Sequence, residues 1–189
     1  MLRSIVLMPR SIVFVQLAAV LVMALNGSAD ARAQSVAPPP PRPSPCAPAE
    51  HRQFDFWLGD WEVRNPAGKI VGHNRIESAH DGCVLIEHWT SVAGVTGTSV
   101  NIYDRDRRQW HQTWVDSGGG LLMLAGGTRG AAMVLVGDAF DADAPTKSAR
   151  QRITWTPLAD GRVRQLWESS SDRGATWSVV FDGLYARKG

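Results

Sequence analysis

The sequence predicts an all-β protein: a single antiparallel up-and-down barrel of about nine or ten strands with a short helix at its N-terminal end. Turn signals recur about every eight to fifteen residues from Trp61 onward, and the runs between them are rich in valine, isoleucine, threonine and tryptophan. No window of helical length shows a sustained 3.6-residue period. Hairpin links favour a meander, and closing a meander into a barrel removes its free edges.

The first 33 residues read as a secretory signal peptide. Arg3 and Arg10 provide the basic start, Ser11 to Leu25 form an apolar run, and Ala31-Arg32-Ala33 is a cleavage pattern. As a helix the run covers only ~22 Å, less than the ~30 Å of a hydrocarbon core, which argues against a membrane anchor. We therefore expect a periplasmic or secreted protein with no membrane span after cleavage.

Residues 34–49 are predicted to form an extended tether. Seven of the 11 prolines fall in residues 38–48, which favours a polyproline-like spacer ahead of a folded domain at 50–189. The first 33 residues hold three of the 20 basic and one of the 18 acidic side chains, so the rest carries 17 of each. This balance argues against nucleic acid as a partner, and the sequence leaves the oligomeric state open.

Cys46 and Cys83 are the only cysteines. In an oxidising compartment the simplest expectation is a disulfide between them, which would close a loop of about 38 residues and contribute ~3–4 kcal/mol. Two free thiols are the alternative. The spacing is not C-x-x-C, so redox catalysis is not expected.

The elements can be assigned in order from the turn signals. A short helix is expected over Ala49–Leu58, followed by strands at Trp61–Arg64, Lys69–Ala79, Cys83–Ala93, Thr98–Asp104 and Gln109–Asp116, with further strands between later glycine-containing turns. Alternation places Trp110, Gln112 and Trp114 on one face of their strand and His111 on the other. In the last strand Trp177, Val179, Phe181, Gly183 and Tyr185 share a face that fits a barrel interior.

All eight tryptophans lie in the predicted barrel domain. One interpretation is an aromatic-lined pocket for a ring, a lipid or a sugar. The other is that a small barrel fills its interior with bulky side chains. Both follow from the same pattern, and the sequence leaves them open.

Ser170–Trp177 matches the Asp-box pattern S-x-D-x-G-x-T-W that is typical of sialidase propellers. A propeller repeats this hairpin over several blades of about forty residues each, and this chain has one copy. We therefore interpret the segment as a hairpin turn in which Trp177 folds back onto the strands.

Gly59-x-Trp61 at the start of the first strand resembles the G-x-W signature of lipocalins and other calycin barrels. The resemblance implies that Trp61 plugs the closed end of the barrel. It also implies that a basic residue near the last strand, here Arg187, packs over the indole ring.

The domain also resembles a family of exported bacterial proteins of unknown function with a calycin-like barrel. The matching segments are FDFWLGDWEV at 54–63, N-x-I-E at 74–77, GCVL-x-E-x-W at 82–89, N-x-Y-D at 101–104, WHQ-x-W-x-D at 110–116 and R-x-TWTPL-x-DGRVRQ-x-WE at 152–168. This resemblance covers roughly residues 50–187. It implies the fold and brings no established activity.

Polar side chains on neighbouring predicted strands supply the candidate site. Glu77, Glu87, Asn101 and Gln112 converge if they share the interior, but a shift of one residue in register would move each to the solvent face. The candidates for ligand binding are Glu87, Trp89, Asn101, His111, Gln112 and Trp114, and the structural candidates are Gly59, Trp61 and Arg187.

Three functions remain open. The first is a binding barrel that holds a small apolar or amphipathic ligand in an aromatic-lined cavity. The second is a hydrolase or isomerase that uses Glu87 with His111 as base and acid, and the third is a non-catalytic structural or interaction module. The five histidines are scattered singly, so no metal site is expected, and a lone histidine is a polar wall residue more often than a haem ligand, so no cofactor is expected.

Overall fold

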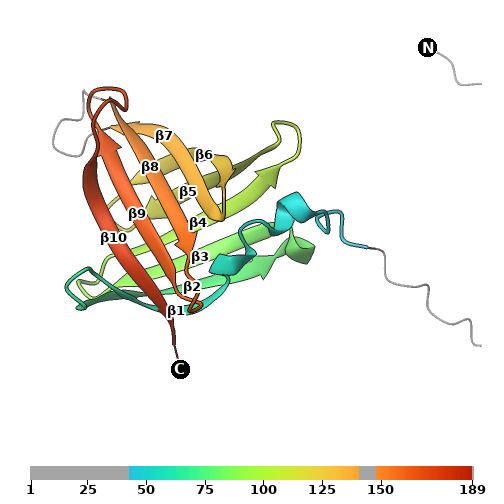
Figure 1. The fold of residues 1–189 in the computed structure, drawn as a ribbon, viewed down its shortest axis with the longest axis horizontal. Coiled ribbons are helices and arrows are strands. Elements are labelled where there is room, and N and C mark those ends of the chain that lie inside the picture. Colours follow the sequence, from blue (N-terminus) through green and yellow to red (C-terminus); the bar gives the residue numbers. More distant parts are fainter. Residues whose placement is uncertain (1–42, 141–147, 189) are drawn as a thin grey trace, which may run out of the picture. The chain divides into compact units, whose positions relative to one another are not determined.

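The computed structural model describes residues 43–140 and 148–188 and confirms the predicted fold class (Figure 1). The chain forms a closed barrel in which each strand pairs with its neighbours in sequence and β1 pairs with β10. The strands are β1 Gly59–Arg64, β2 Ile70–Ala79, β3 Val84–Ser91, β4 Thr96–Asp104, β5 Gln109–Asp116, β6 Leu121–Arg129, β7 Ala132–Phe140, β8 Ser148–Pro157, β9 Val163–Ser170 and β10 Ser178–Arg187. All pairings are antiparallel.

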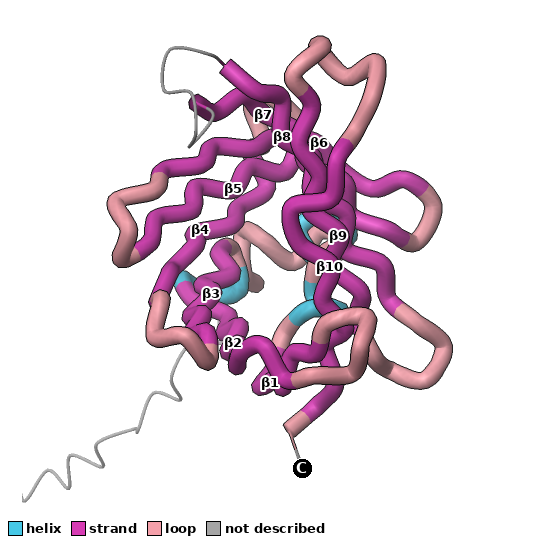
Figure 2. The backbone as a smooth tube through the Cα atoms, turned by 90° about the vertical axis from the view of Figure 1, so that its left-hand side faces the viewer, coloured by secondary structure: helices cyan, strands magenta, loops and turns pink. Residues whose placement is uncertain are grey.

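The short helix expected over Ala49–Leu58 is present as two 3₁₀ turns, η1 (Ala49–Arg52) and η2 (Asp55–Trp57). A third turn, η3 (His80–Gly82), links β2 to β3. Figure 2 shows these turns in cyan beside the strands in magenta. The predicted signal peptide at 1–33 and tether residues 34–42 lie outside the described residues. Across the described part of the chain, no helix is both long and apolar enough to cross a membrane.

The predicted disulfide between Cys46 and Cys83 is present, with Cα atoms 5.0 Å apart. It joins the segment ahead of η1 to the start of β3, and the Cys46 side chain is buried. Beside it, the Ser44 hydroxyl donates a hydrogen bond of 2.6 Å to the carbonyl oxygen of Asp81. The N-terminal turns are therefore fixed to the barrel wall.

Aromatic side chains fill one end of the barrel, which we call the closed end. The rings that meet there are Phe54, Trp57, Trp61, Trp110, Trp155 and Tyr185, all of them buried. Trp57 stacks on Phe54 with ring centroids 5.0 Å apart and lies 5.3 Å from Trp155. Its carbonyl oxygen also accepts a hydrogen bond of 2.9 Å from the Trp61 indole.

The packing of Arg187 over Trp61 explains why residue 59 of the G-x-W segment is glycine. The Arg187 guanidinium lies over the Trp61 ring, 4.2 Å from its centroid. Gly59 has φ +130°, and a Cβ at this position would overlap the Arg187 side chain. A side chain at residue 59 would therefore displace the arginine from the ring.

The Asp-box segment forms the hairpin between β9 and β10, as expected. Asp172 accepts hydrogen bonds from the Thr176 backbone (2.8 Å) and hydroxyl (2.6 Å). Trp177 folds back onto the outer wall with its ring 3.9 Å from the Arg152 guanidinium. A register shift between Val179 and Phe181 interrupts the alternation, so Val179 is 63% exposed. Trp177 and Val179 therefore do not share the interior with Phe181 and Tyr185.

Candidate functional site

Three strands carry the same inward-facing pattern: an apolar residue, a polar residue and a tryptophan at alternate positions. The pattern is Leu85, Glu87 and Trp89 in β3; Trp110, Gln112 and Trp114 in β5; and Val163, Gln165 and Trp167 in β9. β3, β5 and β9 are separated by even numbers of strands in an antiparallel barrel, so they run in the same direction and the three residue types follow one another in the same order along each of them. The interior therefore has an apolar closed end, a polar middle and an aromatic mouth.

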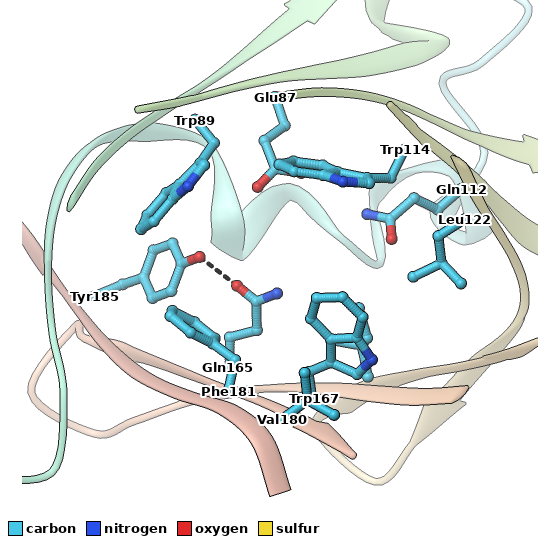
Figure 3. A pocket seen from close by; sticks show the side chains of 11 residues that line it. Glu87, Trp89, Gln112, Trp114, Leu122, Gln165, Trp167, Val180, Phe181 and Tyr185 are labelled. Atoms are coloured by element: carbon cyan, nitrogen blue, oxygen red, sulfur yellow. Dashed lines mark hydrogen bonds between the residues drawn. The ribbon is translucent and has the colours of Figure 1, made fainter. Parts of the chain in front are cut away.

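A cavity of about 220 Å³ lies between the polar middle and the mouth (Figure 3). Its lining is Glu87, Trp89, Gln112, Trp114, Leu122, Ile153, Gln165, Trp167, Val180, Phe181 and Tyr185. The Trp89 and Phe181 rings meet edge to face, with centroids 6.0 Å apart. The rings at the mouth are half-buried, whereas those of the closed end are fully buried. The cavity thus opens toward the mouth.

Glycines hold three of the mouth rings against the barrel wall. A Cβ at Gly72 in β2 would overlap the Trp89 ring, and a Cβ at Gly97 in β4 would overlap the Trp114 ring. Gly183 leaves the corresponding space for Phe181 within β10. Because each ring occupies the space above a missing side chain, it lies along the wall instead of filling the interior. Of the two interpretations of the tryptophans, this geometry matches a lined cavity.

Two indoles at the mouth are also fixed by hydrogen bonds outside the cavity. The Trp114 indole donates to Asp116 Oδ2 (3.1 Å), and the Trp167 indole donates to Gln151 Oε1 (2.7 Å). Neither acceptor lines the cavity. The polar N–H edges of these two rings are therefore satisfied, and their carbon surfaces face the cavity.

The polar middle is a connected network that we call the polar belt; its members are Asn74, Glu87, Ser99, Asn101, Gln112, Gln165 and Tyr185. Glu87 Oε1 accepts from Asn74 Nδ2 (2.7 Å), and Glu87 Oε2 accepts from the Ser99 hydroxyl (2.6 Å). Gln112 Nε2 donates to Asn101 Oδ1 at 2.9 Å. The Tyr185 hydroxyl donates to Gln165 Oε1, a hydrogen bond that is drawn in Figure 3.

Glu87 is the cavity group that titrates near neutral pH. Its burial raises the pKa from the ordinary value of 4.5 to about 7, although the hydrogen bonds from Ser99 and Asn74 act in the opposite direction. Burial, and after it the neighbouring Glu87 charge, raises the pKa of Tyr185 well above its usual range. Tyr185 is therefore a neutral phenol under physiological conditions. No arginine, lysine or histidine is among the described residues that line the cavity.

The raised pKa of Glu87 predicts a pH-dependent stability. A carboxyl group whose pKa is higher in the folded state stabilises the fold below pH 4.5, and this contribution is lost as pH rises through 7. Glutamine cannot ionise, so the free energy of unfolding of Glu87→Gln relative to wild type should rise by about 3 kcal/mol between pH 4.5 and pH 8. Urea unfolding at the two pH values measures this difference.

Glu77→Gln is the matched control for that experiment. Glu77 lies on the outer wall, where it pairs with Arg75 (2.6 Å) and His88 (2.9 Å). Exposed ion pairs contribute little to stability. The free energy of unfolding of Glu77→Gln relative to wild type should therefore change by less than about 1 kcal/mol between pH 4.5 and pH 8. If the free energy of unfolding of Glu87→Gln relative to wild type changes equally little with pH, Glu87 is not a buried carboxyl group with a raised pKa.

The structure brings some of the sequence candidates together and separates others. Four of the six ligand-binding candidates line the cavity: Glu87, Trp89, Gln112 and Trp114. Asn101 is fully buried in the polar belt, beside them but outside the lining. His111 lies on the outer wall, where its ring bonds the Thr113 hydroxyl at 2.9 Å.

Glu87 and His111 do not form the pair that the enzyme hypothesis requires. The two residues occupy opposite faces of the barrel wall, because His111 alternates with the inward-facing Trp110 and Gln112. Glu77 is on the outer wall as well, so it does not converge with Glu87. Within the described residues, no group of three or more histidine, cysteine, aspartate or glutamate side chains is arranged to hold a metal ion.

Four further residues line the cavity that are not among the candidates predicted from the sequence: Gln165, Trp167, Phe181 and Tyr185. A signal for the first two is present in the sequence. Glu-x-Trp in β3 recurs as Gln-x-Trp in β5 and again in β9, on strands that run in the same direction. The recurrence of a polar residue two positions before a tryptophan would have indicated all three positions.

Comparison with known proteins assigns neither a family nor a function to this chain. No protein-family model matches the chain, and no functionally characterised protein matches its sequence significantly. The function is therefore inferred from the geometry of the site.

Proposed function

We propose that this protein is an exported binding barrel that holds a small ring-containing ligand in the cavity at the barrel mouth. The observation that carries the proposal is the seating of Trp89, Trp114 and Phe181 over glycines, which keeps about 220 Å³ of the interior open. A barrel that only needed a packed core would place those rings in this space, since empty interior volume costs stability.

The size of the cavity limits the ligand. Sites for drug-sized molecules measure ~300–1,000 Å³, whereas a cavity of ~150 Å³ holds benzene. A volume of about 220 Å³ therefore suits one ring with a short substituent, or two small fused rings. The aromatic and aliphatic lining favours the ring, and the polar belt at the floor favours a polar group on the substituent.

Export is part of the proposal. It is supported by the predicted signal peptide and by the disulfide, because such bonds persist mainly in oxidising compartments. We also propose that the chain belongs to the calycin-like family that its motifs resemble. The position of Trp61 beneath Arg187 supports this membership.

Binding of a neutral probe tests the proposal. The probe is 2-phenylethanol, and the readout is the ¹H–¹⁵N spectrum of the barrel. The indole N–H signals of Trp89, Trp114 and Trp167 should shift saturably with a Kd below about 1 mM. The signal of Trp177 should not move, because this indole lies on the outer wall.

Two glycine variants make the test specific to the cavity. Gly97→Ala forces the Trp114 ring away from the wall and should weaken binding at least about tenfold. Gly127→Ala is the control, because a Cβ at this position of β6 meets nothing within 4 Å. Equal binding by the two variants, or no saturable shift in wild type, would sink the proposal.

A further inference from the structure

We propose that the ligand of this cavity is a small organic cation, a protonated amine on an aromatic or alkyl group, whose nitrogen binds the Glu87 carboxylate. This inference rests on the proposed function and names its ligand class. It follows from the charges, the rings and the unfilled hydrogen-bonding capacity of the cavity.

The ionisable side chains around the cavity favour a cation. Glu87 comes from β3, and the groups that face it are Asn74 of β2, Ser99 and Asn101 of β4, Gln112 of β5, Gln165 of β9 and Tyr185 of β10. Of these only Tyr185 titrates, and it is neutral. His88 neighbours Glu87 in the chain but points to the outer wall, where it bonds Glu77. The charge of His88 lowers the pKa of Glu87 only as the smallest of the contributions to it. Among the described residues, the buried carboxylate therefore has no positive partner that bonds to it or lines the cavity.

A ligand ammonium would supply that partner. A buried carboxylate without a counter-charge is costly, which is consistent with the raised pKa of Glu87. An anionic ligand would add a second negative charge beside it and meet no basic group in the lining. The electrostatics of the cavity thus select for positive charge and against negative charge.

The aromatic mouth fits the same ligand. The faces of indole and phenyl rings carry partial negative charge and attract cations, and tryptophan is the strongest of them. Trp89, Trp114, Trp167 and Phe181 surround the space into which the Glu87 carboxyl group points (Figure 3). Rings around a carboxylate floor would stabilise both the charge of an amine and the apolar group attached to it.

The hydrogen-bonding groups at the floor can accept from an ammonium. An ionised carboxylate has about four acceptor positions, and Glu87 uses one on each oxygen, for Asn74 and Ser99. Gln112 commits its nitrogen to Asn101 and Ser99, which leaves its carbonyl oxygen for another donor. A protonated amine has donors for both residues, whereas an alcohol has one.

Three probes of matched size test the inference: 2-phenylethylamine, 2-phenylethanol and phenylacetate, titrated calorimetrically at pH 8 and pH 6. The amine should bind at least about tenfold more tightly than the alcohol at pH 8, and phenylacetate more weakly than either. From pH 8 to pH 6 the amine should lose about tenfold in affinity as Glu87 takes up a proton, because a pKa near 7 leaves the carboxylate mostly protonated at pH 6. The alcohol should change less than about threefold over this range.

Two variants locate the effect. Glu87→Gln keeps the shape of the side chain and should weaken amine binding at pH 8 by at least about tenfold, while Glu77→Gln on the outer wall should leave it unchanged. If Glu87→Gln folds poorly, the pH dependence of amine affinity in the wild-type protein still tests whether Glu87 binds the amine. An amine that binds no better than the alcohol, or that binds Glu87→Gln as well as wild type, would overturn the inference while leaving cavity binding intact. The absence of binding by all three probes would overturn both.

Discussion

Replacing Trp57 with alanine is expected to lower the free energy of unfolding by about 4 kcal/mol. Trp57 is fully buried at the closed end, where it stacks on Phe54 and packs at a tilt against Trp155. Removing its ring loses this packing and leaves a cavity that the surrounding rigid rings cannot fill. Urea unfolding followed by circular dichroism measures the loss.

Trp177→Ala provides the matched comparison, because it removes the same side chain from the outer wall. Trp177 contacts Arg152 through a cation–π interaction and is only half-buried, so its loss should cost about 1 kcal/mol, well below the cost of losing Trp57. Similar losses for the two variants would mean that the packing of Trp57 at the closed end does not stabilise the fold.

Removing the disulfide is expected to cost about 4 kcal/mol. Cys46 and Cys83 are 37 positions apart, and a cross-link over a loop of that length lowers the entropy of the unfolded chain by an amount that corresponds to this energy. The double variant Cys46→Ala with Cys83→Ala avoids leaving a free thiol. Its free energy of unfolding, measured in urea, should match that of reduced wild type.

The same bond determines how firmly the closed end is covered. It holds the segment ahead of η1, and η1 leads into the turn that carries Trp57. We expect amide hydrogen exchange in η1 and η2 to accelerate on reduction before the strands are affected. A reduced protein with unchanged stability and unchanged exchange in these turns would contradict this role.

Much of the fold can be predicted from the sequence because its signals are local. Turn residues such as Asn65-Pro66 and Asp160-Gly161 mark strand ends directly, and a run of hairpins in a single small domain leaves few arrangements other than a closed meander. The disulfide can be predicted from the cysteine count together with the predicted signal peptide. These inferences do not depend on how one strand aligns with the next.

The site depends on that alignment, so only part of it can be predicted from the sequence. Alternation places Gln112 and Trp114 together, but the bulge after Val179 exposes a residue that alternation alone places inside. His111 and Glu87 each fit a catalytic role until the register assigns them to opposite faces. The function of Gly72 and Gly97 becomes visible only when the cross-strand rings are in place, because neither glycine is at a turn.

A crystal structure of the barrel with 2-phenylethylamine, grown near pH 8, tests the central claim most directly. We predict that the phenyl ring lies among Trp89, Trp114 and Trp167, and that the nitrogen lies about 3 Å from a Glu87 carboxylate oxygen. The outer wall offers the competing outcome, because Val100, Leu121 and Met123 are exposed there. A probe bound against those residues, with the interior cavity empty, would contradict the proposal that this barrel binds its ligand inside.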